Sequence, residues 1–239
     1  DSTVAGIGIT NNEVVKKLRG DKGTKVKISV LRNSQKELMD FVITRDKIPL
    51  FSVDAGYMID SVTGYIKISR FAEQTYDEFK VKLNNLVSQN MKNLILDLRK
   101  NPGGYLTAAT LIADEFIDEN KLIVYTEGKA YKRNDHFAKN SGKFETGNLV
   151  VLIDEGSASA SEILAGAVQD WDRGIIVGRR SFGKGLVQEQ YELHDGSALR
   201  LTVARYYTPS GRSIQKPYDS GNDAYYNEVN ERYEDGEIE

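Results

Sequence analysis

The chain has 239 residues, of which 40% are apolar, and its formal net charge is −3 at pH 7. This composition predicts one large packed domain, or one domain with part of another, and the slight negative charge argues against a nucleic-acid partner, whose phosphates need clustered Lys and Arg. The absence of cysteine excludes disulfides, thiolate nucleophiles and cysteine-based zinc sites, and no apolar run approaches the roughly 18 residues of a membrane helix.

Residues 1–46 are expected to form part of a domain. Asn11 to Leu18 (NNEVVKKL) predicts a short amphipathic helix that ends before Gly20, and KVKISVLR and MDFVITR alternate as half-buried strands do. One helix and two or three strands are too few to bury an independent core. Residues 47–63 are interpreted as a linker.

From Gly64 onward, strands alternate with helices. YIKISRF predicts a strand, and Thr75 can cap a helix that follows. The apolar positions of that helix recur at helical spacing: Phe79, Leu83, Leu86, Val87 and Met91. Leu94 to Leu98 (LILDL) predicts a strand that is buried on both faces.

The second half of the chain continues this alternation. A helix after the turn NPGG carries Leu106, Leu111, Ile112 and Phe116, and strands are expected at 122–125, 149–153 and 175–177, with a helix from about 160 to 171. LVQEQYEL, the turn HDG and SALRLTVARYY predict a hairpin. The order predicts an α/β (α+β) fold, in which helices flank a mixed sheet with an antiparallel addition.

Two loops follow buried strands, where ligands bind in open α/β sheets: NPGG (101–104) and DEGSASASE (154–162). A serine at a helix N-terminus can have a developing oxyanion stabilised by free N–H groups, which favours Ser159 or Ser161 as a nucleophile. Ser159 and Glu162 also fit the capping-box pattern S-x-x-E, in which the serine only satisfies backbone donors. These local patterns leave both roles open.

A serine nucleophile needs a base, and the two histidines are poor candidates. His194 lies in the turn HDG and His136 in the polar stretch KRNDHFAKN, and the chain has no G-x-S-x-G motif. A desolvated lysine can serve instead, because burial favours the neutral amine. Lys184, in SFGKG, is the candidate.

The same stretch has a rival interpretation. Gly178 to Lys184 (GRRSFGK) fits the opening of a phosphate-binding loop, G-x-x-x-x-G-K. However, Gly185 stands where Ser or Thr should hold magnesium, and the following residues alternate as a strand does. A nucleotide site is therefore disfavoured.

Several separated motifs in the expected order resemble one enzyme family. GSASASEILAGAVQDWDRGIIVGRRSFGKGLVQ, with LDLRKNPGG before it and DGSALRLTVARYYTPSGRSIQ after it, resembles the carboxyl-terminal processing (tail-specific) proteases of serine peptidase family S41. The resemblance implies a ClpP/crotonase-like core at residues 64–217. It also implies that part of a PDZ domain, its last helix and following strands, lies at 1–46.

The resemblance assigns roles to single residues. Ser159 would be the nucleophile, Lys184, 25 positions later, the general base, and Gln188 the support of the lysine. Main-chain N–H groups of Gly103 and Ala160 would form the oxyanion hole.

Further residues would support this site. Gly104 would permit close approach of the backbone. Asp170, Glu162 and Ser181 fall at positions that the family associates with an intact site. Asp97 and Arg99, in LDLR, are expected to form a buried ion pair instead of taking part in chemistry.

The implied function is a serine endopeptidase that acts through a Ser-Lys dyad and an acyl-enzyme, without metal, nucleotide or other cofactor. Its partners would be polypeptides with accessible C-termini, a homo-oligomer is compatible with the family, and the setting would be the bacterial cell envelope or periplasm. The alternative is an inactive fragment that binds peptide tails. Eight acidic residues face one arginine in 219–239, so residues 218–239 are expected to be an exposed or loosely packed acidic tail of a truncated chain.

Overall fold

A computed structural model describes residues 8–32, 37–47, 50–219 and 221–238. The chain forms two compact units, Asp1–Leu50 and Phe51–Glu239, and each is described by itself. No helix in the described part of the chain combines the length and the apolar character needed to cross a bilayer.

The first unit contains α1 (Asn11–Leu18), β1 (Lys25–Val30) and β2 (Met39–Thr44), as the sequence predicted. Thr10 and Glu13 form a capping box at the start of α1, in which the Thr10 N–H donates to the Glu13 carboxylate at 2.8 Å. β1 and β2 pair antiparallel. None of the described residues of this unit is buried, which confirms that it has no core of its own.

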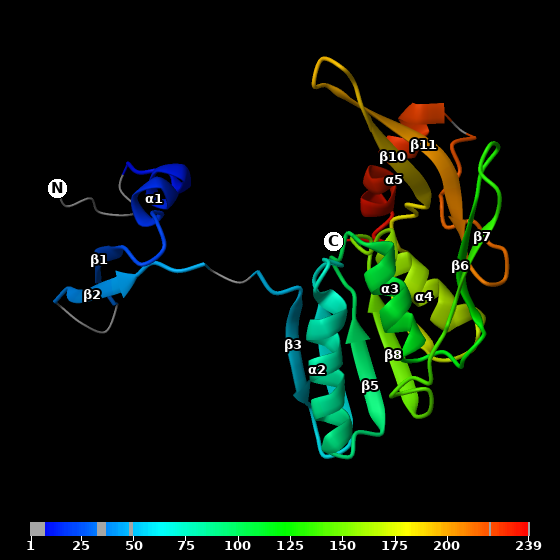
Figure 1. Cartoon of the computed structure of the whole chain (residues 1–239), viewed down its shortest axis with the longest axis horizontal. Helices are drawn as coiled ribbons and strands as arrows, with labels where there is room; N and C mark the ends of the chain where they lie inside the picture. Colours follow the sequence, from blue (N-terminus) through cyan, green and yellow to red (C-terminus); the bar gives the residue numbers. More distant parts are fainter. Residues whose placement is uncertain (1–7, 33–36, 48–49, 220, 239) are drawn as a thin grey trace. The chain divides into compact units, whose positions relative to one another are not determined.

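The second unit holds the remaining elements (Figure 1). Its strands are β3 (Val53–Met58), β4 (Thr63–Ile68), β5 (Asn93–Asp97), β6 (Leu122–Glu127), β7 (Asn134–Phe137), β8 (Asn148–Ile153), β9 (Ile175–Gly178), β10 (Leu186–Glu192) and β11 (Ala198–Tyr207). Its helices are α2 (Thr75–Ser88), α3 (Leu106–Asp114), α4 (Ala160–Asp170) and α5 (Gly221–Glu234).

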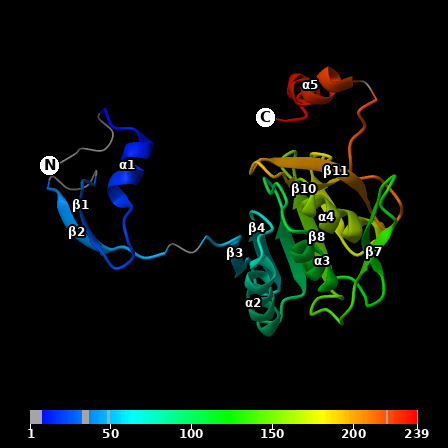
Figure 2. The same ribbon diagram turned by 45° about the horizontal axis from the view of Figure 1, so that its top comes forward.

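Two sheets organise this unit. The first has the order β3-β4-β5-β8-β9, in which β3 is antiparallel to β4 and the other neighbours are parallel. The second is antiparallel and has the order β10-β11-β6-β7. α2 packs against β3 and β4, α4 against β9, and both α3 and α4 also contact β6. Figure 2 shows β10 and β11 lying across the top of this core. The α/β prediction with an antiparallel addition is confirmed.

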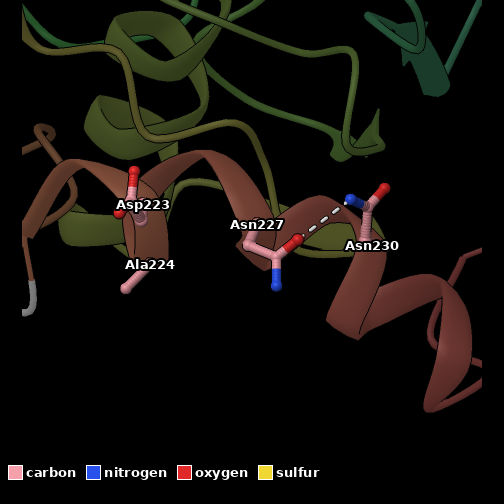
Figure 3. Close-up of a pocket in the computed structure, with 4 residues that line it drawn as sticks. All are labelled: Asp223, Ala224, Asn227 and Asn230. Atoms are coloured by element: carbon pink, nitrogen blue, oxygen red, sulfur yellow. Dashed lines mark hydrogen bonds between the residues drawn. The ribbon is translucent and has the colours of Figure 1, made fainter.

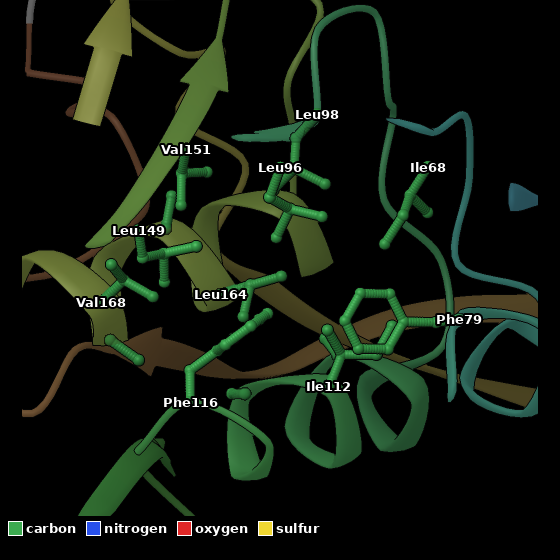
Figure 4. Packing of buried hydrophobic residues seen from close by; sticks show 14 of the residues in the cluster. Ile68, Phe79, Leu96, Leu98, Ile112, Phe116, Leu149, Val151, Leu164 and Val168 are labelled. Atoms are coloured by element: carbon green, nitrogen blue, oxygen red, sulfur yellow. The ribbon is translucent and has the colours of Figure 1, made fainter. Parts of the chain in front are cut away.

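The hydrophobic core lies between the first sheet and helices α2 to α4 (Figure 4). The alternation of β4 places Ile66 and Ile68 inward, and both are fully buried. The rings of Phe79, in α2, and Phe116, after α3, meet edge to face with centroids 5.8 Å apart. This packing fixes the strand ends from which the candidate site loops emerge.

Some predicted positions differ from the structure. The predicted linker at 47–63 contains β3, whose pairing with β4 extends the first sheet. β7 was not expected, because NDHF is polar and depends on its pairing with β6. Val87 and Leu111, assigned to buried helix faces, are 37% and 40% exposed.

Most described residues of the expected acidic tail at 218–239 are exposed, but this segment also contains a helix. Residues 221–234 form α5, and Arg232 and Ile238 are buried. The helix was missed because it has no apolar stripe, and its packing relies on charged side chains.

Candidate active site

The two predicted loops meet because β5 and β8 are parallel neighbours. The Ala158 N–H donates to the Asn101 carbonyl at 3.0 Å, and the Ser161 hydroxyl donates to the same oxygen at 3.0 Å. The Ser157 hydroxyl donates to the Leu98 carbonyl at 2.8 Å. Ser157 and Ser161 therefore attach the second loop to the first, in agreement with a structural role for both.

Ser159 lies at the junction of the β8–α4 loop with α4, and its backbone conformation is strained. Its φ is +55° and its ψ is −113°, values that residues with a side chain rarely adopt. Such strain costs roughly 1–3 kcal/mol and is concentrated at functional sites. A sharp strand-to-helix turn with a strained serine is also how the nucleophile of an α/β-hydrolase is displayed. Ser159 is half-buried, and its neighbours Ala158 and Ala160 are buried.

Glycines allow the NPGG turn to touch this junction. Gly103 has φ +92°, and a Cβ there would lie 2.5 Å from the Ala158 carbonyl oxygen and 2.8 Å from the Ala160 nitrogen. Gly104 has φ +144°, and a Cβ there would lie 2.0 Å from the Phe71 carbonyl oxygen. Only glycine fits both positions.

The main-chain donors at this contact are not equivalent. The Gly103 N–H, the expected oxyanion donor, donates to the Asn101 side-chain oxygen at 2.9 Å. Within the described residues, the N–H groups of Gly104 and Ala160 make no hydrogen bond. The two unpaired donors therefore come from Gly104 and Ala160.

Asn101 is a functional-site residue that sequence reasoning missed. It is fully buried, and its amide donates to the Ile68 carbonyl at 2.9 Å while its side-chain oxygen holds the Gly103 N–H. The only signal in the sequence was its place before Pro102-Gly103, which is typical of any tight turn.

Glu162 joins the backbone at Ser159 to the lysine loop, defined as residues 179–185. One carboxylate oxygen accepts the N–H groups of Ser159 and Lys184, each at 2.8 Å. The two nitrogens can therefore lie no more than twice 2.8 Å apart. The other oxygen accepts the Ser181 hydroxyl at 2.7 Å and the Gly183 N–H at 2.6 Å. The capping-box pattern is present, and its glutamate also holds the lysine loop.

Two further contacts bind the lysine loop to the serine loop. The Phe182 N–H donates to the Ser157 carbonyl at 3.0 Å. The Arg179 guanidinium donates to both carboxylate oxygens of Glu155, at 2.7 and 3.2 Å, and these hydrogen bonds lower the pKa of Glu155.

The main chains of Ser159 and Lys184 meet at Glu162, but their side chains form no hydrogen bond with each other in the described structure. The Lys184 side chain is exposed, and in the described structure no hydrogen bond links it to the Ser159 hydroxyl. Gln188 is exposed on β10, and the one hydrogen bond of its amide within the described residues is to Thr202 Oγ1, at 3.5 Å. A β-bulge lies between Val187 and Gln188.

Asp170 lies at the other end of α4 from Ser159. The 11 residues of that helix separate the two by roughly 16 Å at 1.5 Å per residue. The Asp170 carboxylate accepts the Ser210 N–H at 2.9 Å and pairs with Arg212. Burial opposes its ionisation, but hydrogen bonds from Thr208, Ser210 and Arg212 prevail and lower its pKa. Asp170 thus fastens a turn and is not brought to the serine.

The disfavoured alternatives find no support in the geometry. His136 lies on β7, where burial lowers its pKa, and His194 lies in the hairpin turn. The lysine loop continues into β10, a strand, and not into the helix that a phosphate-binding loop requires. No metal-binding cluster of acidic and histidine side chains occurs among the described residues.

The chain is similar to proteins of one enzyme family. The family model described as "Peptidase family S41" matches residues 62–221. A carboxy-terminal-processing protease of Bartonella bacilliformis is 40% identical over 215 residues, which cover 87% of this chain and 48% of that protein. A carboxyl-terminal-processing protease of Synechocystis sp. is 41% identical over 86% of this chain and 48% of its own length.

A solved structure shares the fold. The photosystem II D1 C-terminal processing protease superposes with a TM-score of 0.65 at 30% identity, over 82% of this chain and 54% of that one. The chain spans about half the length of the curated relatives that it matches.

Proposed function

The chain belongs to peptidase family S41, and on this basis we propose that it is the core of a serine endopeptidase that cleaves polypeptides near their C-terminus. The observation that carries the proposal is the strained Ser159 at the mouth of α4, held by the same Glu162 oxygen that holds Lys184. A structural cap alone has no need of a φ of +55°.

In the proposed reaction, the Ser159 hydroxyl oxygen attacks the scissile carbonyl carbon while the neutral Lys184 amine takes the hydroxyl proton. The oxyanion that forms is stabilised by main-chain N–H groups, of which those of Ala160 and Gly104 have no other partner in the described residues. The C–N bond then breaks, and the Lys184 ammonium gives its proton to the leaving amine. A water molecule, deprotonated by Lys184, then attacks the acyl carbon, and as the ester bond breaks the Lys184 ammonium returns the proton to the Ser159 oxygen.

The exposure of Lys184 gives the substrate a part in this scheme. A bound polypeptide would exclude water from this exposed side chain, and desolvation favours the neutral amine that the reaction requires. We assign to Gln188 the support of the Lys184 amine when the polypeptide is bound, and to Ser181 and Glu162 the positioning of the lysine loop.

The wider setting is also part of the proposal. Relatives named carboxy-terminal processing proteases support polypeptide substrates with accessible C-termini and a location in the bacterial cell envelope. Residues 1–46 would be part of a PDZ domain, which binds substrate tails by adding them to a sheet edge. A homo-oligomer is compatible with this function.

A serine-reactive fluorophosphonate probe tests the nucleophile directly. We expect the probe to label Ser159, located by peptide mass spectrometry, and Ser159→Ala to lose labelling and peptide cleavage. Ser88→Ala, on the exposed end of α2, is the matched control and should keep both. Labelling of another serine, or cleavage by Ser159→Ala, would show that the assignment is wrong.

The exposed Lys184 amine favours one alternative, a scaffold that binds peptide tails without turnover. It predicts that a peptide with a free C-terminus binds and is recovered intact. Lys184→Ala separates the two functions. If Lys184 is the base, the variant loses acylation of Ser159 by an activated ester, whereas in a scaffold the binding of the peptide is the measured property and should not change.

A further inference from the structure

Two sets of contacts hold the lysine loop. In the first set, Glu162 accepts hydrogen bonds from Ser181, Gly183 and Lys184. The second set comes from residues 221–238, which we name the C-terminal strap. It consists of α5 and the short segment after it (Figure 1).

Arg180, in the lysine loop, is the contact point of the strap. Its guanidinium lies 3.1 Å from the Glu228 carboxylate and 3.1 Å from that of Glu237. Burial opposes the ionisation of Glu237, but the hydrogen bonds and charges of Arg180 and Arg232 together prevail and lower its pKa. One cation of the loop therefore binds the strap at two places, the middle of α5 and the segment after it.

Arg232 makes the reverse contact. Its guanidinium donates to the main-chain carbonyl of Arg180 at 2.8 Å and lies 2.8 Å from the Glu237 carboxylate. Its side chain is only 7% exposed, so it cannot exchange these partners for water. A buried guanidinium that holds a main-chain carbonyl fixes the backbone of the loop, whereas surface ion pairs alone would leave it mobile.

Lys216 connects the strap to the residue beside Lys184. Its N–H donates to the Gly183 carbonyl at 3.0 Å, and its ammonium binds the Glu228 carboxylate and donates to the Tyr225 carbonyl at 2.9 Å. The ammonium also lies 3.9 Å from the centre of the Tyr225 ring. A displacement of α5 is thus transmitted to Gly183 through a single side chain.

The helix uses one face for these contacts. Tyr225, Glu228 and Arg232 recur at spacings of three and four residues, which places them on one side of α5. Another side carries a shallow polar hollow lined by Asp223, Ala224, Asn227 and Asn230 (Figure 3). In the described structure none of these four residues has a hydrogen bond or ion pair with the lysine loop.

We propose that the C-terminal strap positions the general base: Arg180 and Arg232 lock the lysine loop in the conformation that places the Lys184 N–H on Glu162. The inference rests on the proposed function for its catalytic meaning, since Lys184 is a base only in that scheme. Arg180 and Arg232 are positioning residues that act through the loop and do not touch the substrate.

The test compares two double variants of the full chain. Glu228→Gln with Glu237→Gln removes both carboxylates from Arg180, while Glu231→Gln with Glu234→Gln makes the same charge change at exposed positions of the same helix. Hydrogen exchange of the main-chain amides of Gly183 and Lys184 is measured by mass spectrometry. We expect about tenfold faster exchange in the first variant, from the loss of two ion pairs, and no change in the second.

Kinetics with a chromogenic peptide add the catalytic readout. We expect the first variant to lose kcat with little change in KM, and added salt to weaken the native enzyme in the same direction because it screens the partly exposed pairs. Arg232→Lys, which keeps the charge but loses the planar guanidinium and its reach, should lie between native and Arg232→Gln.

The outcomes separate the strap from the proposed function. Equal exchange in the two double variants overturns the strap, whatever the activity. Faster exchange with unchanged kcat overturns the positioning role. The exchange comparison is repeated in a Ser159→Ala background and does not depend on catalysis. Failure of the native chain to cleave any peptide therefore bears on the proposed function alone.

Discussion

A single carboxylate, that of Glu162, organises the candidate site at the level of residues. Its two oxygens accept four hydrogen bonds, two on each oxygen. A carboxylate suits this task because both of its oxygens only accept. An amide in the same place would point its NH₂ group at one of these two pairs of donors. One pair consists of two main-chain N–H groups, and in the other pair only the Ser181 hydroxyl could accept instead.

We therefore expect Glu162→Gln to lower kcat by about 10- to 1000-fold, in the range of losing positioning and oxyanion groups. At least one part-buried main-chain donor would also lose its acceptor, which costs about 1–3 kcal/mol of unfolding free energy. Peptide hydrolysis and urea unfolding measure the two effects.

Glu73→Gln, at an exposed position just before α2, is the control and should change neither kcat nor the free energy of unfolding. Activity within twofold of the native value in Glu162→Gln would contradict the role assigned to the carboxylate.

The close approach of the NPGG turn makes a second residue-scale prediction. Gly103→Ala should destabilise the fold by about 3 kcal/mol or more and abolish activity, because both the positive φ and the 2.5 Å contact with Ala158 oppose a Cβ. Gly196→Ala has a similar φ of +82° with nothing within 4 Å. It should show the conformational cost alone, so equal destabilisation of the two variants would refute the packing argument. Thermal unfolding gives the comparison.

At the scale of elements, the carboxyl end of β5 is stabilised by the ion pair that the sequence predicted, although only its carboxylate is buried and the Arg99 side chain is 51% exposed. Asp97 is fully buried and binds the Arg99 guanidinium at 2.7 and 3.0 Å and the Tyr65 hydroxyl at 2.7 Å. Burial opposes the ionisation of Asp97, but the hydrogen bonds from Arg99 and Tyr65 prevail and lower its pKa. Burial, with the hydrogen bond to Asp97, raises the pKa of Tyr65 to about 12.

Because its folded pKa is lowered, Asp97 contributes stability above its ordinary pKa of 3.8 and loses that contribution as the pH falls through the folded value. Asp97→Asn should cost about 1–3 kcal/mol near neutral pH, and the difference from the native chain should vanish in acid. Urea unfolding across pH tests this. Asp77→Asn, at an exposed site, should show no such pH dependence, and a gap that persisted in acid would contradict the linkage.

The elements that the sequence predicted are those with a strong hydrophobic period. α2, β4 and β5 were located from their apolar residues, and α4 from its cap and length. β3 contains Ala55 and Gly56, β7 reads NDHF, and α5 is polar on all sides. Each of these elements is stabilised by another segment: a neighbouring strand for β3 and β7, and charged side chains of the lysine loop for α5. The local sequence does not show which distant segment will pair with it.

The site was predictable to a similar degree. Motif order indicated Ser159, Lys184 and Glu162, and the parallel strands bring their main chains together. The positions of Gln188 and Asp170 depend on a strand bulge and on the length of a helix. In the described residues Gln188 makes no hydrogen bond with Lys184, and Asp170 lies at the far end of α4 from Ser159. Asn101 acts through buried main-chain contacts, for which its residue type gave no signal.

At the scale of the whole molecule, stability is concentrated in the second unit. Every buried hydrophobic side chain in the described residues lies from Val53 onward. We expect residues 51–239 alone to unfold cooperatively within about 5 °C of the full chain, and residues 1–50 alone to show no cooperative transition. Circular dichroism melting curves decide this, and a sharp transition in the short piece would contradict it.

The backbone angle of Ser159 has a consequence for engineering. Glycine adopts a φ of +55° without strain, so Ser159→Gly relieves a conformational penalty at the same position where it deletes the hydroxyl. A library selected only for heat resistance would accept this change, and its survivors would be folded and inert. Directed evolution of this chain therefore has to select on turnover and on stability together.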